Sequence, residues 1–345
     1  MLKHRFRALR ISLLGLLFSC GFALLVARVF AGVTRPHQSG DEYKRWLLPC
    51  TLDSAYDGTS PASYRSLIFH ASDGARLHAD FWAQAVASPT IVICHGYRAS
   101  RANMRSLAAL EYALGYNVLT FDFRGHGDSE GIVTAGDVAG VRDLQAALAI
   151  ASQQPETLPG KICVHAFSIG ASVALLTLPH RDVFALIADS PYAYMDEVLR
   201  RVIGWRLFTS RFNKRHCLRK FASILPWSLV VVTNLVFRMH FGYALIHAID
   251  KNFEYWSTLS QTRSASFSST PVLLIHSMGD QLTPISHACH FVSKAQRCNI
   301  SLEAYFVNSA VHCGAFQQYP QQYMTTLQHF LSYHLEHIRS QSSVA

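Results

Sequence analysis

Short, uninterrupted apolar runs alternate with helical patterns through most of the chain. Helical patterns cover about 101–115 and 137–152, begin at about 168, and recur over about 286–296 and 316–337. Strands that are apolar throughout, rather than at alternate positions, are typical of a parallel sheet covered by helices on both faces. The alternation therefore predicts an α/β fold. Its core strands are expected at residues 90–94, 117–123, 162–166, 184–188, 272–276 and 302–307.

Two further features complete the predicted organisation. Ser72-Asp73-Gly74 separates two runs of strand-forming residues, which indicates a β-hairpin before the first parallel strand. About 80 residues separate the strands 184–188 and 272–276, far more than an ordinary crossover needs. We therefore predict an inserted helical cap. The expected divisions are a linker over 34–62, a core formed by 63–193 and 271–340, and a cap over 194–270.

Composition fits a packed protein whose excess charge is local. Of 345 residues, 50% are apolar and 15% charged, which excludes a disordered chain. The net charge of +9 arises from residues 1–10 (+4) and 194–270 (+7), so the rest of the chain sums to −2. A charge confined to two segments disfavours nucleic acid as a partner. The eight cysteines show no paired ligand spacing, so no metal site is predicted.

An apolar segment follows the basic N-terminal residues directly. Residues 11–27 are uncharged and mostly apolar, near the lower length limit for a membrane-spanning helix. We predict an N-terminal membrane anchor within residues 1–33. A signal segment cleaved after Ala31 is the alternative, which would leave a secreted or periplasmic protein. The basic residues before the segment favour a body on the non-cytoplasmic side of the membrane.

Four short motifs with polar residues lie just beyond predicted strands. Residues 166–170, Ala-Phe-Ser-Ile-Gly, lie where a buried strand meets a helix, and their small residues suit a tight turn that exposes a serine hydroxyl. A helix N-cap is the ordinary role of such a serine. The other motifs are His95-Gly96-Tyr97, Gly279-Asp280 and the loop that contains His312. Because parallel strands end at one edge of the sheet, Ser168, Asp280 and His312 are predicted to converge.

Together these motifs resemble those of the α/β-hydrolase superfamily over roughly residues 64–337. The pattern is most similar to the serine-aminopeptidase-like and membrane-anchored acyl-hydrolase branches. In those branches HGxxxx, DxRGxGxSxG and GxSxG follow successive strands, as His95–Ser100, Asp122–Gly131 and residues 166–170 do here. Ala166 departs from the glycine usual in the family. The resemblance implies a mostly parallel sheet with helices on both faces and an inserted helical cap.

The resemblance also implies a role for each candidate residue. Ser168 would attack a carbonyl carbon, His312 would accept and return the proton, and Asp280 would orient the imidazole. The backbone N–H groups of Tyr97 and Ile169 would form an oxyanion hole. This chemistry needs neither a metal nor an organic cofactor.

Other charged residues near these motifs have competing interpretations. Asp189 is the rival for the acid, because some relatives take the carboxylate from the end of that strand. Asp122 and Arg124 are expected to form a charged pair that pins the glycine-rich loop after them. His126 and His165 are not expected to be catalytic.

The expected function is that of a membrane-anchored serine hydrolase that cleaves carboxylic esters of acyl or lipid-like substrates. A thioesterase, an amidase or peptidase, and a catalytically silent membrane-tethered binding protein are the alternatives. The expected partners are a small acyl-ester or lipid substrate and a membrane. No nucleic acid is expected.

The cap joins a basic stretch to the apolar run Ile224 to Phe237. It is expected either to cover an apolar cleft or also to lie on an anionic bilayer. The run is about 14 residues long and ends at Arg238, which is short for a second span.

Overall fold

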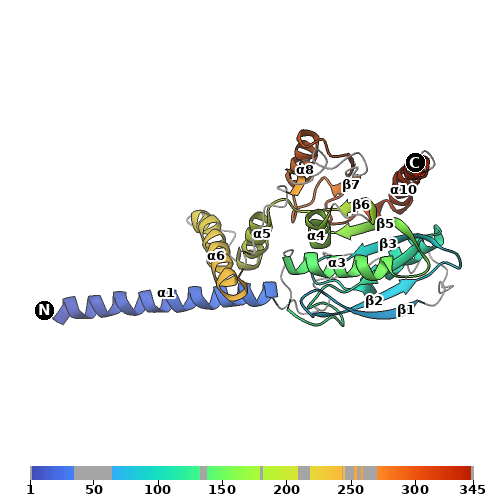
Figure 1. The fold of residues 1–345 in the computed structure, drawn as a ribbon. Helices are drawn as coiled ribbons and strands as arrows, with labels where there is room; N and C mark the ends of the chain where they lie inside the picture. Colours follow the sequence, from blue (N-terminus) through green and yellow to red (C-terminus); the bar gives the residue numbers. More distant parts are fainter. Residues whose placement is uncertain are drawn as a thin grey trace. The chain divides into compact units, whose positions relative to one another are not determined.

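Eight strands form one sheet in the order β1-β2-β4-β3-β5-β6-β7-β8 (Figure 1). The hairpin of β1 (Arg65–His70) and β2 (Arg76–Trp82) joins β4 in the antiparallel sense, and every later pair of neighbouring strands is parallel. The predicted hairpin and parallel sheet are thus confirmed. The parallel strands are β3 (Ser88–Cys94), β4 (Asn117–Phe121), β5 (Thr157–Phe167), β6 (Val183–Asp189), β7 (Val272–Ser277) and β8 (Leu302–Val307).

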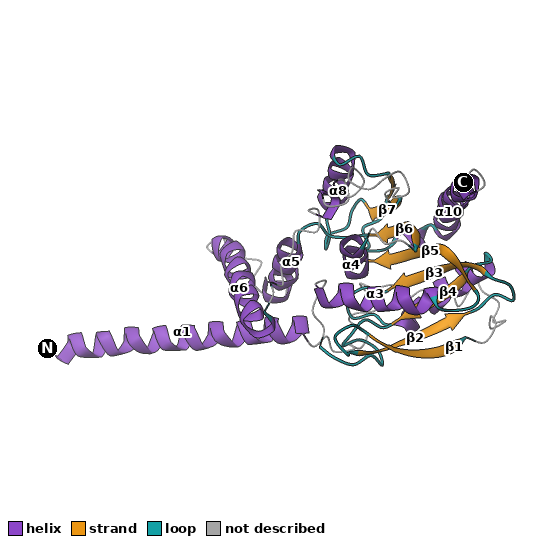
Figure 2. Cartoon of the chain, in the orientation of Figure 1, coloured by secondary structure: helices purple, strands orange, loops and turns teal. Residues whose placement is uncertain are grey.

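Helices cover both faces of this sheet, as predicted. Figure 2 shows α3 (Val138–Ser152) and α4 (Ile169–Thr177) in front of the strands. On the other face, α2 (Arg105–Ala113) and α10 (Pro320–Ser342) pack on apolar strand residues through a common core. The predicted C-terminal helix is interrupted between α9 (Ala315–Gln318) and α10, because Pro320 has no backbone N–H to continue the helix.

The strand order places two functional motifs side by side. β3 pairs with β4 on one side and β5 on the other, so the chain changes direction across the sheet at β3. Loops at the carboxyl ends of strands next to such a switch point are where ligands bind in open α/β sheets. His95–Tyr97 follows β3 and Ser168 follows β5. The fold therefore brings both motifs to the edge predicted for the site.

The structure describes residues 2–34, 64–132, 138–178, 182–208, 218–242, 244, 252–254, 258 and 270–342. The chain divides into two units. The larger, Pro36–Tyr194 with His247–Ala345, contains the sheet, and the smaller combines Met1–Arg35 with Met195–Ile246. Nearly all of the predicted linker over 34–62 lies outside the described residues.

The smaller unit contains three helices with a core of their own. They are α1 (Leu2–Thr34), α5 (Met195–Phe208) and α6 (Leu218–Phe241). Its buried apolar core consists of Val26, Ile203, Leu229 and Val230. The predicted anchor segment is therefore helical, and it shares a unit with most of the predicted cap. The remainder of that cap belongs to the larger unit, where Phe253 packs on Phe291 of α8 (Ile285–Arg297).

The helix that contains the apolar run of the cap extends beyond that run. α6 continues past Arg238 to Phe241, so Ile224–Phe241 forms an 18-residue window with a mean hydropathy of 1.4. Among the described residues it is the one helix long and apolar enough to cross a membrane by length and composition. A core helix of a soluble protein can meet the same criterion. The uncharged run therefore ends at Arg238, as the sequence indicates, and the helix continues beyond it.

Candidate active site

Ser168 lies at the junction of β5 and α4 in a left-handed backbone conformation, with φ 52° and ψ −115°. Such a conformation costs a non-glycine residue about 1–3 kcal/mol, so the surroundings must impose it. Backbone hydrogen bonds hold the turn on both sides. The Ser168 N–H donates to the Asp189 carbonyl at 2.8 Å, and the Ser168 carbonyl accepts the Ser172 N–H at 3.0 Å.

Small residues around Ser168 allow the turn to pack against β3. A Cβ atom on Gly170 would lie 2.6 Å from the His95 carbonyl oxygen, so a side chain there would force the backbones apart. Ala166 is fully buried between Cys94 and Ala188 on the neighbouring strands. Alanine is therefore accommodated where the family usually has glycine. The close approach also places the segment that holds Ile169 beside the one that holds Tyr97.

His312 joins Ser168 to Asp280. Its Nε2 lies 2.8 Å from Ser168 Oγ, and its Nδ1 lies 2.6 Å from Asp280 Oδ2. The serine hydroxyl can donate to Nε2 while the Nδ1–H donates to the carboxylate. The structure thus brings together three side chains that are 112 and 32 residues apart in the sequence. Each comes from a loop at the carboxyl end of a strand: β5, β7 and β8.

Three donors surround the Asp280 carboxylate besides His312. The N–H groups of Leu282 and Thr283 donate to Oδ1 at 2.8 and 3.0 Å, and the Thr283 hydroxyl donates to Oδ2 at 2.7 Å. Burial acts to raise the pKa of Asp280, but His312 and the Thr283 donors outweigh it, so the pKa lies below its usual value. Asp280 is thus held as a carboxylate.

The pKa of His312 lies well above its usual value. Burial of the ring acts to lower it, but Cys313 and Asp280 outweigh that effect.

Thr283 is a site residue that sequence reasoning missed. Its signal is a threonine three positions after an aspartate at the start of a loop, a spacing at which the aspartate accepts hydrogen bonds from the local backbone.

Asp189, the rival acid, has other partners. Its two carboxylate oxygens accept from the Ser190 hydroxyl at 2.8 Å and from the Tyr323 hydroxyl at 3.1 Å. Burial raises the pKa of Asp189 to about 6. The Tyr323 hydroxyl in turn contacts His165 Nε2 at 2.8 Å. The hydrogen bonds of the His312 ring thus favour Asp280 as the acid, and Asp189 belongs to a buried polar chain behind the site.

Two neutral histidines fix the loop that contains Tyr97. His95 Nε2 accepts the Phe123 N–H at 3.0 Å, and His126 Nε2 accepts the Arg98 N–H at 3.1 Å. Arg98 itself has a φ of 64°. Burial lowers the pKa of His95 to about 4 and that of His126 to about 3. Both nitrogens therefore remain acceptors near neutral pH and tie the loop after β3 to the loop after β4.

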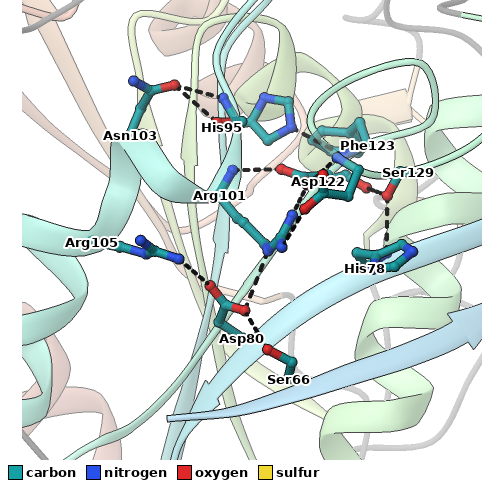
Figure 3. Close-up of polar contacts among 12 residues, drawn as sticks. Ser66, His78, Asp80, His95, Arg101, Asn103, Arg105, Asp122, Phe123 and Ser129 are labelled. Atoms are coloured by element: carbon teal, nitrogen blue, oxygen red, sulfur yellow. Dashed lines mark hydrogen bonds and ion pairs between the residues drawn. The ribbon is translucent and has the colours of Figure 1, made fainter. Parts of the chain in front are cut away.

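Asp122 and Arg124 do not pair with each other, so that expectation is wrong. Figure 3 shows the Arg101 side chain between Asp122 and Asp80, with an ion pair to each carboxylate. Asp122 turns inward, where it also accepts the N–H groups of Arg101 and Asp128. The Arg124 guanidinium instead reaches Asp143 of α3 at 2.6 Å and Asp73 of the hairpin turn at 2.8 Å. Each residue still pins the loop, through a different partner.

Among the described residues, no group of three or more histidine, cysteine, aspartate and glutamate side chains is placed to hold a metal ion. The cysteines that the structure describes are not joined in disulfides. The side chains of the site offer a chemistry of their own. A hydroxyl, an imidazole and a carboxylate stand in line, which is the arrangement that activates a serine as a nucleophile.

Comparisons with known proteins identify the family and the fold. The family model described as serine aminopeptidase, S33, matches residues 85–313. The uncharacterized protein YqkD of Bacillus subtilis is 27% identical over 253 residues, which is 70% of each chain. A Mycobacterium tuberculosis protein is 30% identical over 136 residues, 39% of this chain, and the match spans only 48% of that relative. The Pyrococcus furiosus esterase Pf2001 has a similar fold, with a TM-score of 0.61 at 22% identity over 87% of this chain and 97% of the esterase.

Proposed function

We propose that this chain, which belongs to the serine aminopeptidase S33 family of hydrolases, is a serine hydrolase that cleaves carboxylic esters. The observation that carries the proposal is the pair of contacts from His312 to Ser168 and Asp280, at 2.8 and 2.6 Å. Retention of all three side chains in this geometry argues against a catalytically silent binding protein.

The mechanism follows from these contacts. The Ser168 oxygen attacks the ester carbonyl carbon while its proton passes to His312 Nε2. The backbone N–H groups of Tyr97 and Ile169 stabilise the oxyanion, and Asp280 stabilises the imidazolium. The Nε2 proton then passes to the departing alkoxide, which leaves an acyl group on Ser168. Water, deprotonated by His312, hydrolyses this acyl-enzyme and restores the serine.

Esters are the leading substrate class because the similar Pyrococcus furiosus protein is named an esterase. Thioesters and amides share the tetrahedral oxyanion, and the family takes its name from an aminopeptidase. The leaving group separates these classes. A series of nitrophenyl esters, acyl thioesters and aminoacyl anilides of matched acyl length therefore tests the choice, and faster cleavage of the anilides would move the assignment to peptides.

Ser168→Ala tests the nucleophile. This variant should lose ester hydrolysis by on the order of 10⁴-fold or more and lose covalent labelling by a fluorophosphonate probe, because the attacking hydroxyl is gone. Ser172→Ala is the matched control, since Ser172 is buried one helical turn further along α4. Circular dichroism should show both variants folded. Labelling that persists in Ser168→Ala would remove Ser168 from its role.

We place this enzyme at a membrane through α1. The uncharged run 11–27 lies within this helix behind four basic residues, which supports an anchor with the catalytic body on the non-cytoplasmic side. A tethered hydrolase is suited to acyl or lipid-like esters that reside in the same bilayer.

A further inference from the structure

The exposed face of α6 is apolar, unlike that of a surface helix in a soluble protein. Its exposed large apolar residues recur at intervals of three and four positions and so form one stripe. Trp227 is 55% exposed and Met239 is 77% exposed, whereas the polar Thr233 is fully buried. Such a stripe marks an interaction surface. We call this surface the α6 stripe; it consists of Ile224, Trp227, Val231, Leu235 and Met239.

The sheet topology excludes α6 as a membrane-spanning helix. β6 and β7 are hydrogen-bonded neighbours, so residues 189 and 272 lie on the same side of any bilayer. The chain between them must therefore cross the membrane an even number of times. Among the described residues only α6 meets the length and hydropathy criterion for a span. α5 has 14 residues with two acids in its first turn, and the sequence over 243–269 is interrupted by Asp250, Lys251, Glu254 and Arg263. The number of crossings in this segment is therefore zero.

α6 contacts only one part of α1, the helix proposed as the membrane anchor, among the described side chains. The α1 residues that pack with α6 lie in its C-terminal half, from Phe22 to Phe30. Phe30 contacts the rings of Phe237, His240 and Phe241 at the end of α6. Leu16, further towards the α1 N-terminus, is 61% exposed. Figure 1 shows α6 crossing α1 near the C-terminal end of α1. If α1 spans the bilayer through residues 11–27, its exit on the body side is where α6 crosses it.

Charge at both ends of α6 suits an anionic lipid surface. In the sequence, Arg211, Lys214, Arg215, Arg219 and Lys220 precede the α6 stripe, and Arg238 follows most of it. No charged residue lies between Ile224 and Phe237. Amphipathic helices that lie in the interface plane combine a Trp- and Leu-bearing apolar face with basic residues, which pair with lipid phosphates.

We infer that the α6 stripe lies in the headgroup and acyl boundary of the bilayer, parallel to the membrane plane, and that the partner of this surface is anionic phospholipid. The inference deepens the proposed function, because it rests on the α1 anchor and brings lipid esters close to the same enzyme. A helix that lies in the interface accounts for the exposed apolar face of α6. It also agrees with the even number of membrane crossings required between β6 and β7.

Fluorescence quenching tests where α6 lies. The full chain is reconstituted in phosphatidylcholine and phosphatidylserine vesicles with bromines placed either near the headgroup or deep in the acyl chains. The Trp227→Phe variant should lose most of the quenching of tryptophan fluorescence by the brominated lipids. The Trp205→Phe variant, changed on α5, should retain that quenching. Quenching that is unchanged in Trp227→Phe would overturn the inference. In the Trp227→Phe background, Val231→Trp should be quenched most by shallow bromines, whereas a spanning helix would place it among the deep ones.

Hydrolysis separates this inference from the proposed function. Leu235→Glu should slow the hydrolysis of an ester presented in anionic vesicles and leave the hydrolysis of a soluble nitrophenyl ester in detergent unchanged. Leu235→Ala is the matched control. If Leu235→Glu changed the oligomeric size in detergent, a second copy would be the partner. If it changed KM for the soluble ester, the stripe would be a substrate lid. Either result overturns the lipid assignment, whereas a wild-type chain without soluble-ester hydrolysis overturns the enzyme alone.

Discussion

Three residues around the site share a strained backbone conformation. Ser168, Ser190 and Cys313 have φ values of 52°, 53° and 53°. The Asp189 carbonyl accepts the Ser168 N–H, and the Ser190 hydroxyl accepts the Cys313 N–H at 3.3 Å. The end of β6 therefore holds both the turn at Ser168 and the loop that contains His312. Strain at these positions persists because the neighbouring residues enforce it.

Comparing Ser190→Gly with Ser190→Ala separates the effect of backbone strain at residue 190 from the effect of losing its hydroxyl. Glycine adopts a φ near 53° without steric conflict, so the variant should unfold at a higher temperature than Ser190→Ala, which loses the same hydroxyl but keeps the strain. Ser190→Gly also removes the hydroxyl that donates to Asp189 and accepts the Cys313 N–H. We expect kcat for a soluble ester to fall about fivefold, as the loss of a hydrogen bond worth about 1 kcal/mol implies, with KM little changed. Ser190→Ala, which keeps the strain and also lacks the hydroxyl, is the comparison. Unaltered kcat in both variants would contradict this role.

The raised pKa of His312 predicts a pH dependence. His312 must be neutral to accept the Ser168 proton, so kcat/KM should rise with pH through a pKa above the usual 6.5 of histidine. Asp280→Asn removes the negative charge that favours the imidazolium. In the pH profile of kcat/KM for this variant, the acidic limb should therefore shift to lower pH. The plateau value of kcat/KM should fall by on the order of 10³–10⁴-fold. A pH–rate profile for each protein measures both effects. If Asp189→Asn proved more damaging than Asp280→Asn, the acid assignment would move to Asp189.

At the scale of elements, the loop after β4 depends on one glycine. A Cβ atom on Gly127 would lie 2.0 Å from Asp122 Oδ2, and its φ is +50°. Gly127→Ala should therefore lower the free energy of unfolding by more than about 2 kcal/mol, because it adds a clash to the backbone strain. Gly160→Ala is the control, since Gly160 has a φ of +66° with nothing within 4 Å. This control should lose about 1–2 kcal/mol from strain alone. Equal losses in denaturant titrations would contradict the packing argument.

The sheet was predictable because its signal is local. Most of the parallel strands contain a continuous apolar run, although β5 includes Lys161 and β8 includes Glu303. The Asp-Gly turn between β1 and β2 has a known hairpin geometry. The length of α6 was not. Arg238 interrupts the apolar run in the sequence, but a charged side chain on an exposed helix face does not end a helix. The backbone hydrogen bonds of α6 continue past Arg238, and the helix ends at Phe241.

The candidate triad was predictable because strand ends in a parallel sheet share an edge, which places Ser168, Asp280 and His312 together without any contact information. The partners of Asp122 and Arg124 were not. Both residues pair across the fold, with Arg101 and Asp143, and sequence proximity favoured the wrong pair. Long-range polar pairs depend on side-chain direction, which spacing along the chain does not determine.

At the scale of the whole molecule, catalysis and attachment belong to different units. All of the candidate catalytic residues lie in the larger unit, whereas α1 and α6 lie in the smaller one. The charge is divided in a similar way, since residues 1–10 and 194–270 carry +4 and +7 and the rest of the chain sums to −2. Attraction to an anionic membrane, as proposed above, would therefore act mainly on the basic segments of the chain.

Anchoring by α1 predicts how the full chain behaves in cells. The wild-type protein should stay in the membrane fraction after an alkaline carbonate wash, which strips proteins held only at the interface. Leu16→Arg places a charge within the proposed span, at about 2.5–3.5 kcal/mol at the centre of a helix, and should release a large fraction of the protein. Leu16→Ala should remain bound. Leu16 is suited to this test because its side chain is largely exposed, so that the α1–α6 packing survives. A soluble wild-type product that begins near Gly32 would establish signal cleavage instead.

The orientation of the anchor is tested by protease added to intact cells. The protease should digest the body, because the basic residues before the proposed span favour a cytoplasmic N-terminus. Digestion that occurs only after lysis would reverse the orientation.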